Sequence, residues 1–300
     1  MKAAALALVP VLASAAAFAQ DGAPCAAIWA SAQARAGEAG YTLTGRIGPE
    51  TGASCVFLDL LAESQVWAWS AESVVAEGEA LAWAAGEPAP GLMTLRLDAL
   101  RALPRSGDPV QDYLAEVQAR PIFLDLRLEW NDVRNELQIH DLSLDLSGGN
   151  SLSLRATFAN VDLSGEAAIF ASLSAVTMPG FELHLRNGDL FETVILPQIL
   201  PDLAEPGVTP AESLSRFRDG LRERISALPE PPFTHETRAP LEQIAATLPH
   251  PAGEASLRIS DPSGGLIRTI IGTAVFGETP DPAANYLKDT TWHIGWMPGR

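Results

Sequence analysis

The stretch from Leu124 to Leu163 decides the fold class, and it runs LDLRLEWNDVRNELQIHDLSLDLSGGNSLSLRATFANVDL. Apolar residues occupy every second position over most of its length, with polar or charged residues between them. A period of two is typical of β-strands that bury one face and expose the other. Two interruptions, Asn131–Asn135 and Ser147–Asn150, consist of turn-forming residues. The stretch therefore predicts antiparallel strands joined by hairpins.

The alternation changes parity once within this stretch. Leu137 and Ile139 occupy odd positions, whereas Leu142, Leu144 and Leu146 occupy even positions. A shift of one residue reverses the two faces of a strand, so a regular strand would turn one of these sets away from the core. One extra residue, in the form of a β-bulge, keeps both sets on one side. We therefore predict a bulge near His140–Asp141.

The same patterning extends over residues 121–186, where Ile169–Leu173 and Phe181–Leu185 are expected as the last strands. The expected result is an antiparallel meander with one apolar and one polar face. The apolar side chains of this meander are candidates to line a site for an apolar ligand: Leu124, Leu126, Leu128, Trp130, Leu142, Leu144, Leu146, Leu152, Leu154 and Phe158.

The segments on either side add helices and further strands. Before the meander, residues 20–120 predict an α+β portion with helices at Pro24–Glu38 and Asp108–Gln118 and short strands between them. After it, residues 187–277 predict a helical portion with one short strand, and residues 278–300 a tail with a terminal strand. The later elements are expected at Pro240–Leu248, Ala255–Ile259, Leu266–Phe276 and Trp292–Trp296.

The strongest helix signal begins at Thr209, which is followed by Pro210 and, at the third position, by Glu212. This arrangement is a capping box, and it predicts a helix from Pro210 to Leu228. Its apolar stripe is a natural cover for the meander, and it consists of Leu214, Phe217, Leu221, Ile225 and Leu228. The fold class is therefore α+β, an antiparallel amphipathic meander with amphipathic helices packed on one face, and residues 20–300 are expected to form one continuous domain.

Residues 1–19 have the pattern of a secretory signal peptide. Lys2 provides the positive charge, Ala3–Phe18 is a short apolar run, and Ala17-Phe18-Ala19 is a small-x-small cleavage site. We expect cleavage after Ala19 and export to the periplasm, with an uncleaved membrane anchor as the alternative. No later stretch is long and apolar enough to suggest a transmembrane helix.

The chain has two cysteines, Cys25 and Cys55. An even number of cysteines in an exported protein predicts a disulfide. Their spacing is not the C-x-x-C of a redox-active pair, so we expect a structural bridge that closes a loop of about 30 residues.

Composition excludes some partners. The chain carries 37 acidic and 20 basic residues, a formal net charge of -17. Nucleic acids are recognised by clustered lysine and arginine, and so are anionic lipid headgroups, which argues against both as partners. Hydrophobic residues make up 47% of the chain, which is enough for a packed core.

No motif indicates an enzyme, a cofactor or a metal. The five histidines are dispersed without zinc-ligand spacing, and neither G-x-S-x-G nor S-x-x-K occurs. Acid pairs such as Asp125 with Glu129 are expected on a solvated strand face. Tryptophans such as Trp67 and Trp130 could line a sugar-stacking or ligand-binding surface, and core packing is the commoner use of tryptophan in a β-rich fold. A hydrolase whose catalytic residues come from distant segments remains a minor alternative.

The pattern from Leu124 to Leu163 resembles the β-groove segments of AsmA-like periplasmic envelope proteins of Gram-negative bacteria. The resemblance implies a curved sheet with an apolar trough that handles lipids or other apolar molecules. Our expectation is an exported, non-enzymatic protein that binds a lipid-like ligand or an envelope partner. The alternative is a structural or interaction module whose apolar face is covered by its own helices.

Overall fold

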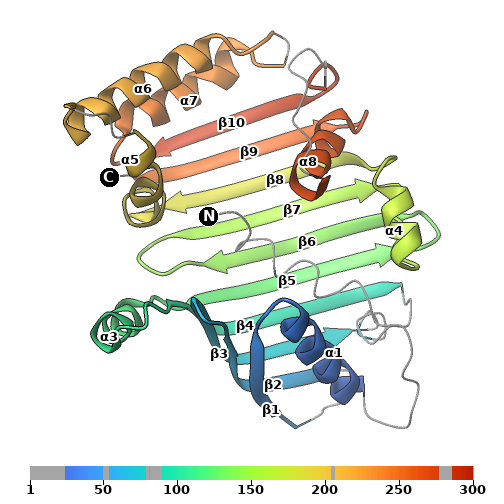
Figure 1. Cartoon of the computed structure of the whole chain (residues 1–300). Helices are drawn as coiled ribbons and strands as arrows, with labels where there is room; N and C mark the ends of the chain where they lie inside the picture. The colour runs from blue at the N-terminus through green and yellow to red at the C-terminus, as the bar shows by residue number, and fades with distance from the viewer. Residues whose placement is uncertain are drawn as a thin grey trace. The chain divides into compact units, whose positions relative to one another are not determined.

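The computed structural model describes residues 24–49, 54–78, 81, 90–203, 207–230, 232–276 and 286–299. These residues form ten strands and seven α-helices, which confirms the α+β fold class with antiparallel strands (Figure 1). The chain divides into two units, of which the first comprises the chain up to Asp145 together with Phe158–Ala175, and the second comprises Leu146–Thr157 together with Val176–Arg300. The expected signal peptide lies outside the described residues.

The first unit contains consecutive antiparallel strands, each paired with the next in the sequence. Short connections between neighbouring strands favour this order, because antiparallel neighbours need no crossover. The strands are β1 (Thr42–Ile47), β2 (Ser54–Glu63), β3 (Trp67–Gly78), β4 (Gly91–Pro104), β5 (Ile122–Asn131) and β6 (Glu136–Asp145), and the helices are α1 (Pro24–Glu38), α3 (Pro109–Gln118) and α4 (Glu166–Ser172).

The predicted bulge is confirmed at His140. In the pairing of β5 with β6, Arg127 lies opposite Asp141 and Leu128 lies opposite Ile139, so His140 is the extra residue. Its imidazole Nε2 lies 2.9 Å from the Glu129 carboxylate. The bulge brings Ile139 and Leu142 to one face of the sheet, as the parity change requires.

Two further irregularities interrupt the strands of the first unit. Asp59 in β2 and Ala99 in β4 both have φ of 53°. Residues other than glycine adopt this left-handed conformation only rarely, and within a sheet it marks a bulge. The pairing of β4 with β5 shifts register at Ala99, between Leu97 and Leu100. Bulged strands bend, so Asp59 and Ala99 are expected to bend β2 and β4.

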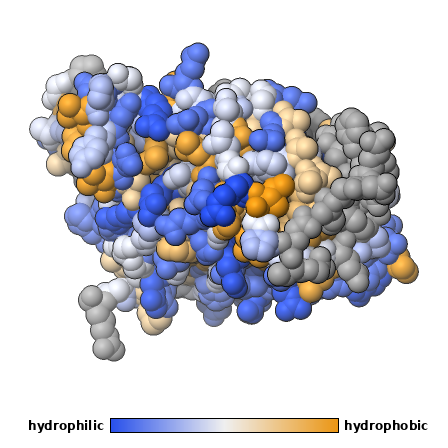
Figure 2. Space-filling view, turned by 90° about the horizontal axis from the view of Figure 1, so that it is seen from below, coloured by the Kyte–Doolittle hydropathy of each residue, from blue (hydrophilic) through white to orange (hydrophobic). Residues whose placement is uncertain are grey.

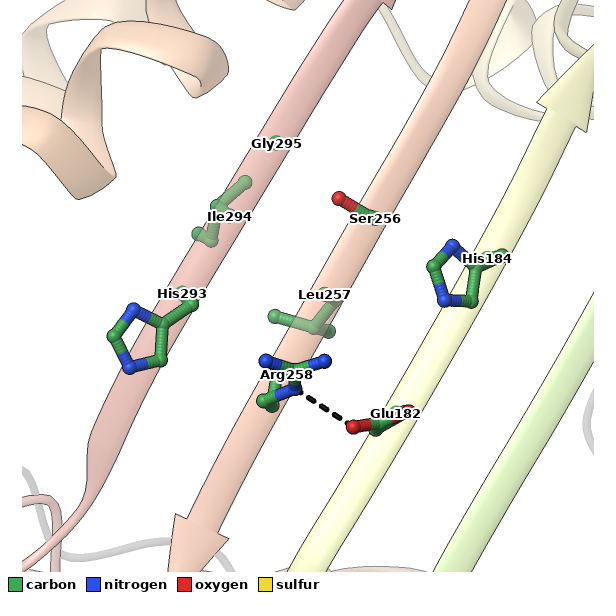
Figure 3. Close-up of a pocket in the computed structure, with 8 residues that line it drawn as sticks. All are labelled: Glu182, His184, Ser256, Leu257, Arg258, His293, Ile294 and Gly295. Carbon is green, nitrogen blue, oxygen red and sulfur yellow. Dashed lines mark hydrogen bonds and ion pairs between the residues drawn. The ribbon is translucent and has the colours of Figure 1, made fainter.

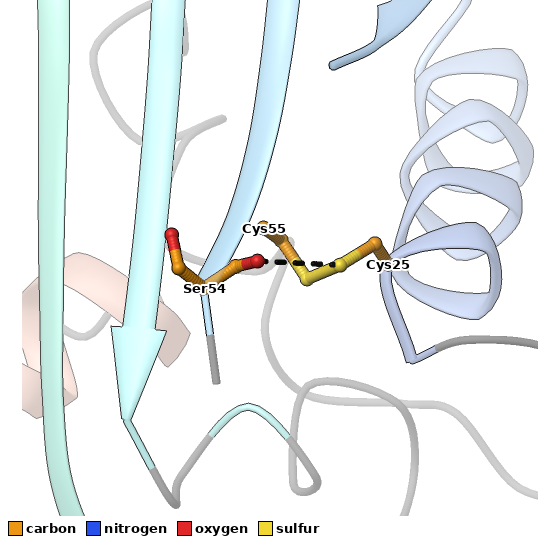
Figure 4. Close-up of a disulfide and its surroundings, with 3 residues drawn as sticks. All are labelled: Cys25, Ser54 and Cys55. Carbon is orange, nitrogen blue, oxygen red and sulfur yellow. Dashed lines mark hydrogen bonds between the residues drawn. A yellow bond between two sulfur atoms is a disulfide. The ribbon is translucent and has the colours of Figure 1, made fainter. Parts of the chain in front are cut away.

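Helix α1 covers part of the sheet of the first unit, and a disulfide links the helix to the sheet. Cys25 in α1 and Cys55 in β2 are bonded, with an S–S distance of 2.05 Å (Figure 4), which confirms the predicted bridge. The ring of Trp29 stacks on Phe57 with centroids 5.6 Å apart. Leu81 is buried in the same cluster. The core of this unit therefore lies between α1 and strands β2 and β3.

One predicted strand is wrong. The alternation predicts a strand at Ile169–Leu173, whereas the structure places this segment in helix α4 and its C-cap. Alternation over five residues does not distinguish a strand from a short helix. The alanines at 167, 168 and 171 favour the helix, because alanine has the highest helix propensity. Hydrogen bonds of Ile169 to Gly165 and of Leu173 to Ile169 complete it.

The second unit contains most of β7 (Ser151–Ala159) and a three-stranded antiparallel set at the end of the chain. Its elements are β8 (Thr177–Asn187), the π-helix η2 (Phe191–Ile195), α5 (Leu196–Leu203), α6 (Pro210–Ser226), α7 (His235–Thr247), β9 (Gly253–Asp261), α8 (Gly265–Phe276) and β10 (Thr291–Pro298). The sequence did not indicate η2 or α5. Helix α7 begins at His235 rather than at the expected Pro240.

Helices cover part of the sheet in the second unit. Helix α7 packs on β10 and α8 packs on β8 and β9. The Phe233 ring lies 5.1 Å from that of Trp292, and Ala245 in α7 is fully buried. Helix α6 has the predicted capping box between Thr209 and Glu212, and it packs on α7 and α5. Along its stripe Ile225 is buried, and Leu214, Phe217 and Leu221 are half-buried.

Candidate functional site

The first candidate site is an apolar surface on strands β4 to β6 of the first unit. Register places Leu95, Leu126 and Leu142 side by side across the three strands, and Leu97, Leu124 and Leu144 in the next row. We call this surface the apolar sheet face. It consists of Met93, Leu95, Leu97, Leu124, Leu126, Leu128, Trp130, Leu137, Ile139, Leu142 and Leu144.

Burial changes across the apolar sheet face. Met93 and Leu97 in β4 are buried, and Leu95 contacts the cluster beneath α1. By contrast, Leu126 in β5 and Leu142 in β6 are only half-buried, as are the other leucines of these two strands. The part of the face next to α1 is therefore closed, and the part on β5 and β6 retains accessible apolar area.

The opposite face of the same strands is polar. Arg96 and Asp125 form an ion pair with 2.8 Å between Nε and Oδ1, and both side chains are more than half exposed. Arg127 is also exposed, and it lies on this face between Thr94 and Asp141. The two faces differ in character as the alternation of the sequence predicts.

Trp130 stands apart from the other members of the apolar sheet face. It is only 5% exposed, and its indole N–H donates to the Val161 carbonyl at 3.1 Å. A buried tryptophan with a satisfied N–H is typical of a core residue. The predicted ligand-lining residues outside β5 and β6 are also half-buried. Phe158 belongs to the first unit, and Leu146, Leu152 and Leu154 belong to the second.

A second candidate is a polar hollow of ≈ 240 Å³ on strands β8, β9 and β10 (Figure 3). Arg258 in β9 donates to the Glu182 carboxylate in β8 at 2.7 Å. His184 lies opposite Ser256 in the pairing of β8 with β9, and His293 lies opposite Arg258 in that of β10 with β9. The sequence pattern does not distinguish this group, because its polar residues occupy ordinary polar positions of three alternating strands.

Because Gly295 has no side chain, the hollow is open beside Ser256. A Cβ atom at this position would lie 2.5 Å from Ser256 Oγ, which is closer than real side chains approach. In the described part of the chain, no hydrogen bond joins Ser256 to His184 or His293. A nucleophile needs a base within hydrogen-bond reach.

Among the described residues, no group of three or more His, Cys, Asp or Glu side chains could hold a metal ion. Imidazole–carboxylate pairs occur singly, such as His250 with Glu192 at 3.0 Å. Hydrogen bonds from Ser106 lower the pKa of Asp112, and hydrogen bonds from Thr209 lower that of Glu212. Both pKa shifts therefore arise from hydrogen bonds within a turn or a helix cap.

The view from below in Figure 2 shows hydrophobic residues scattered among many hydrophilic ones. Within the described ranges, no helix combines the length and the hydropathy needed to cross a bilayer. Comparison with known proteins finds no family model, no curated protein and no solved structure that matches this chain.

Proposed function

We propose that this chain is an exported, non-enzymatic protein that binds a lipid-like ligand on the apolar sheet face. The observation that carries the proposal is the incomplete burial of Leu126, Leu142 and their neighbours on β5 and β6. These side chains share a face with buried residues of β4, whereas α1 packs mainly on β1 and β2. A ligand with a hydrocarbon chain would remove the remaining apolar area from water, which stabilises a complex by about 25 cal/mol per Å².

The chemistry of this surface supports a hydrocarbon rather than a polar ligand. The central rows of the face are leucines, and the charged residues Asp125 and Arg127 of the same strand lie on the opposite face. Burying a charged group against such a row would leave the charge without a partner, at a cost of several kcal/mol. The ligand class is therefore an acyl chain or a similar apolar group.

Export is part of the proposal. The sequence of residues 1–19 supports a signal peptide cleaved after Ala19, and the Cys25–Cys55 bridge supports an oxidising compartment such as the periplasm. Disulfides persist there and are rare in the cytosol.

The second candidate function is a structural or interaction module with a closed core. It is favoured by the second unit, where α7 buries Ala245 completely and brings Phe233 against Trp292 in β10. Covering apolar strands with the chain's own helices is the usual solution in α+β folds. The two candidates differ in whether lipid binds at β5 and β6.

Native mass spectrometry of the chain from Gln20 tests the proposal. The delipidated protein is mixed with a short-chain phosphatidylcholine below its critical micelle concentration, and bound lipid is counted. The paired substitution Leu126→Gln with Leu142→Gln should abolish the adduct, whereas Arg127→Gln on the polar face of the same strand should retain it. A wild-type protein without adduct, or one whose adduct survives in the paired variant, would favour the closed module.

A further inference from the structure

The polar hollow on β8, β9 and β10 is lined by two rows of side chains that cross the three strands. Each row takes one residue from every strand, and the rows are Glu182, Arg258, His293 and His184, Ser256, Gly295. The two rows lie two positions apart along each strand, so they share one face. Trp292 has the opposite parity in β10, and Phe233 contacts it on the other face. The hollow therefore lies on the polar face of these strands.

Arg258 offers unused donor groups to the hollow. Its Nε donates to the Glu182 carboxylate at 2.7 Å, yet the side chain remains 65% exposed (Figure 3). In the described part of the chain, the two terminal nitrogens of this guanidinium make no hydrogen bond. Glu182 therefore holds the guanidinium in place through one nitrogen and leaves the other two available. Arginine binds carboxylate and phosphate groups through such a planar fork of N–H groups.

Two further donors lie beside this guanidinium. The Ser256 hydroxyl is two positions from Arg258 on β9, and His184 lies opposite Ser256 on β8. Among the described residues, neither of these two side chains has a hydrogen-bond partner. Neighbouring strands are about 5 Å apart, so one small ligand can reach donors from more than one strand. The hydroxyl and the imidazole both donate to oxygen atoms, the imidazole in either protonation state.

Glycine at position 295 leaves room for a ligand beside Ser256. The hollow has a volume of ≈ 240 Å³. Pockets that hold drug-sized molecules begin at about 300 Å³, so this hollow suits a smaller ligand. Its donors are spread over two strands, which favours a polar group with several oxygen atoms.

The charges around the hollow suit an anion. Of the lining residues in the described part of the chain, only Glu182 is acidic, and it is paired with Arg258. The next acid on this face of β9 is Glu254, and both Nε and Nη2 of Arg186 donate to it. Each carboxylate is thus balanced by a guanidinium. A bound anion would therefore meet no unpaired negative charge within these two rows, although the chain as a whole carries a net charge of -17.

Arg96 in the first unit shows what distinguishes the hollow. Its Nε donates to Asp125 at 2.8 Å, and its side chain is as exposed as that of Arg258. The hydrogen bond to Asp125 raises the pKa of Arg96, and the charges of Asp98 and Glu77 raise it further. Acids therefore surround Arg96 and would repel an anion. The same kind of ion pair thus occurs in two electrostatic settings, and only that of Arg258 suits an anionic ligand.

We propose that the hollow binds the phosphate group of a small phosphate ester. The Arg258 fork holds two phosphate oxygens, and the Ser256 hydroxyl and the His184 N–H donate to the others. A carboxylate has only two oxygens and would leave part of this donor set unused. The open side at Gly295 accommodates the ester substituent. A single phosphate needs one such site rather than a basic surface, so the acidity of the chain does not oppose it.

Phosphorus NMR titration of glycerol phosphate with the chain from Gln20 tests the inference. We expect the wild type to bind, and Arg258→Gln to lower the affinity about tenfold or more, because charge-assisted hydrogen bonds are lost. Arg96→Gln removes an equally exposed guanidinium and should bind as the wild type does. Gly295→Ala fills the hollow without changing its charge, since the added Cβ would lie 2.5 Å from Ser256 Oγ, and it should also weaken binding.

A wild type that binds no glycerol phosphate would overturn the inference, and so would equal binding by Arg258→Gln. Arg258→Lys keeps the charge and removes the fork, so undiminished binding by this variant would contradict the assigned geometry. Thermal melts of the variants check that they fold.

A second ligand, dihexanoyl phosphatidic acid below its critical micelle concentration, identifies the source of the phosphate. Binding that is tighter than that of glycerol phosphate, and that Arg258→Gln weakens, assigns the hollow to a lipid headgroup, whereas equal affinity assigns it to a soluble ester. The variant with Leu126→Gln and Leu142→Gln should bind glycerol phosphate as the wild type does. Failure of lipid binding at the apolar sheet face would therefore leave this inference standing.

Discussion

Asn150 and Asp189 are joined through their side chains in the second unit, where Nδ2 of Asn150 donates to Oδ1 of Asp189 at 2.7 Å. The same amide nitrogen donates to the Ser147 carbonyl, and Oδ1 of Asn150 accepts from the N–H groups of residues 188, 189 and 190. Asn150 is 3% exposed. One buried side chain therefore ties the turn before β7 to the start of the helical segment after β8.

We predict that Asn150→Ala lowers the free energy of unfolding by about 2–4 kcal/mol, because buried backbone N–H groups lose their acceptor. Urea denaturation of the purified protein measures this change. Gln111→Ala, at an exposed position of α3, serves as a control and should change the value by less than about 0.5 kcal/mol. If Asn150→Ala also changed the free energy of unfolding by less than about 0.5 kcal/mol, water would replace the hydrogen bonds of the side chain without loss of stability.

The disulfide should contribute through the unfolded state. The bridge joins residues separated by 30 positions. Closing a loop of this size stabilises the folded state by about 3.6 kcal/mol in the chain-entropy model. Replacing Cys25 and Cys55 together by alanine should lower the unfolding free energy by about this amount, measured with and without reductant. The wild type should lose stability in reductant and the double variant should not. If reductant lowered the stability of the wild type and of the double variant equally, the assigned disulfide would be contradicted.

The two faces of β5 and β6 should respond differently to substitution. Leu144→Asp places a carboxylate on the apolar sheet face and should cost several kcal/mol. Arg127→Ala removes an exposed side chain from the polar face and should change stability by less than about 0.5 kcal/mol. Thermal unfolding compares the two variants. Equal shifts in melting temperature would overturn the assigned register.

The capping box of α6 should make stability depend on pH. Hydrogen bonds from the backbone N–H and the hydroxyl of Thr209 lower the pKa of Glu212 in the folded state. A lowered folded pKa gives stability that is present above the unfolded value, ordinarily 4.5, and is lost as the pH falls through the folded value.

Glu212→Gln should therefore lower the melting temperature at about pH 7 and have a smaller effect at about pH 3, where the wild-type carboxyl is protonated. Glu223→Gln on an exposed part of the same helix is the control for a general change in charge. An equal effect of Glu212→Gln at both pH values would show that the cap does not depend on the carboxylate.

Local patterns in the sequence predicted much of the fold. The first helix has the predicted bounds, Pro24–Glu38, and the bulge at His140 follows from parity alone. Capping residues located the start of α6, because hydrogen bonds between Thr209 and Glu212 involve neighbours in the sequence. These features depend on interactions within a few residues, which a sequence displays directly.

Features that depend on distant contacts were not predictable in the same way. The apolar residues Val110, Tyr113, Leu114 and Val117 of α3 have the spacing of a buried face, yet the structure leaves all four exposed. Alternation in Ile169–Leu173 was too short to exclude a helix. The incomplete burial of Leu126 and Leu142 also depends on where α1 lies, and no local pattern gives that position.

The central claim is that an acyl chain lies on the apolar sheet face, and photo-crosslinking tests it most directly. A phosphatidylcholine with a diazirine in one acyl chain is bound to the chain from Gln20 below its critical micelle concentration, irradiated, and mapped by peptide mass spectrometry. The account predicts crosslinks concentrated in peptides of residues 122–145, with loss of these crosslinks in the variant carrying Leu126→Gln and Leu142→Gln. Crosslinks absent from these strands, or unchanged in that variant, would contradict it.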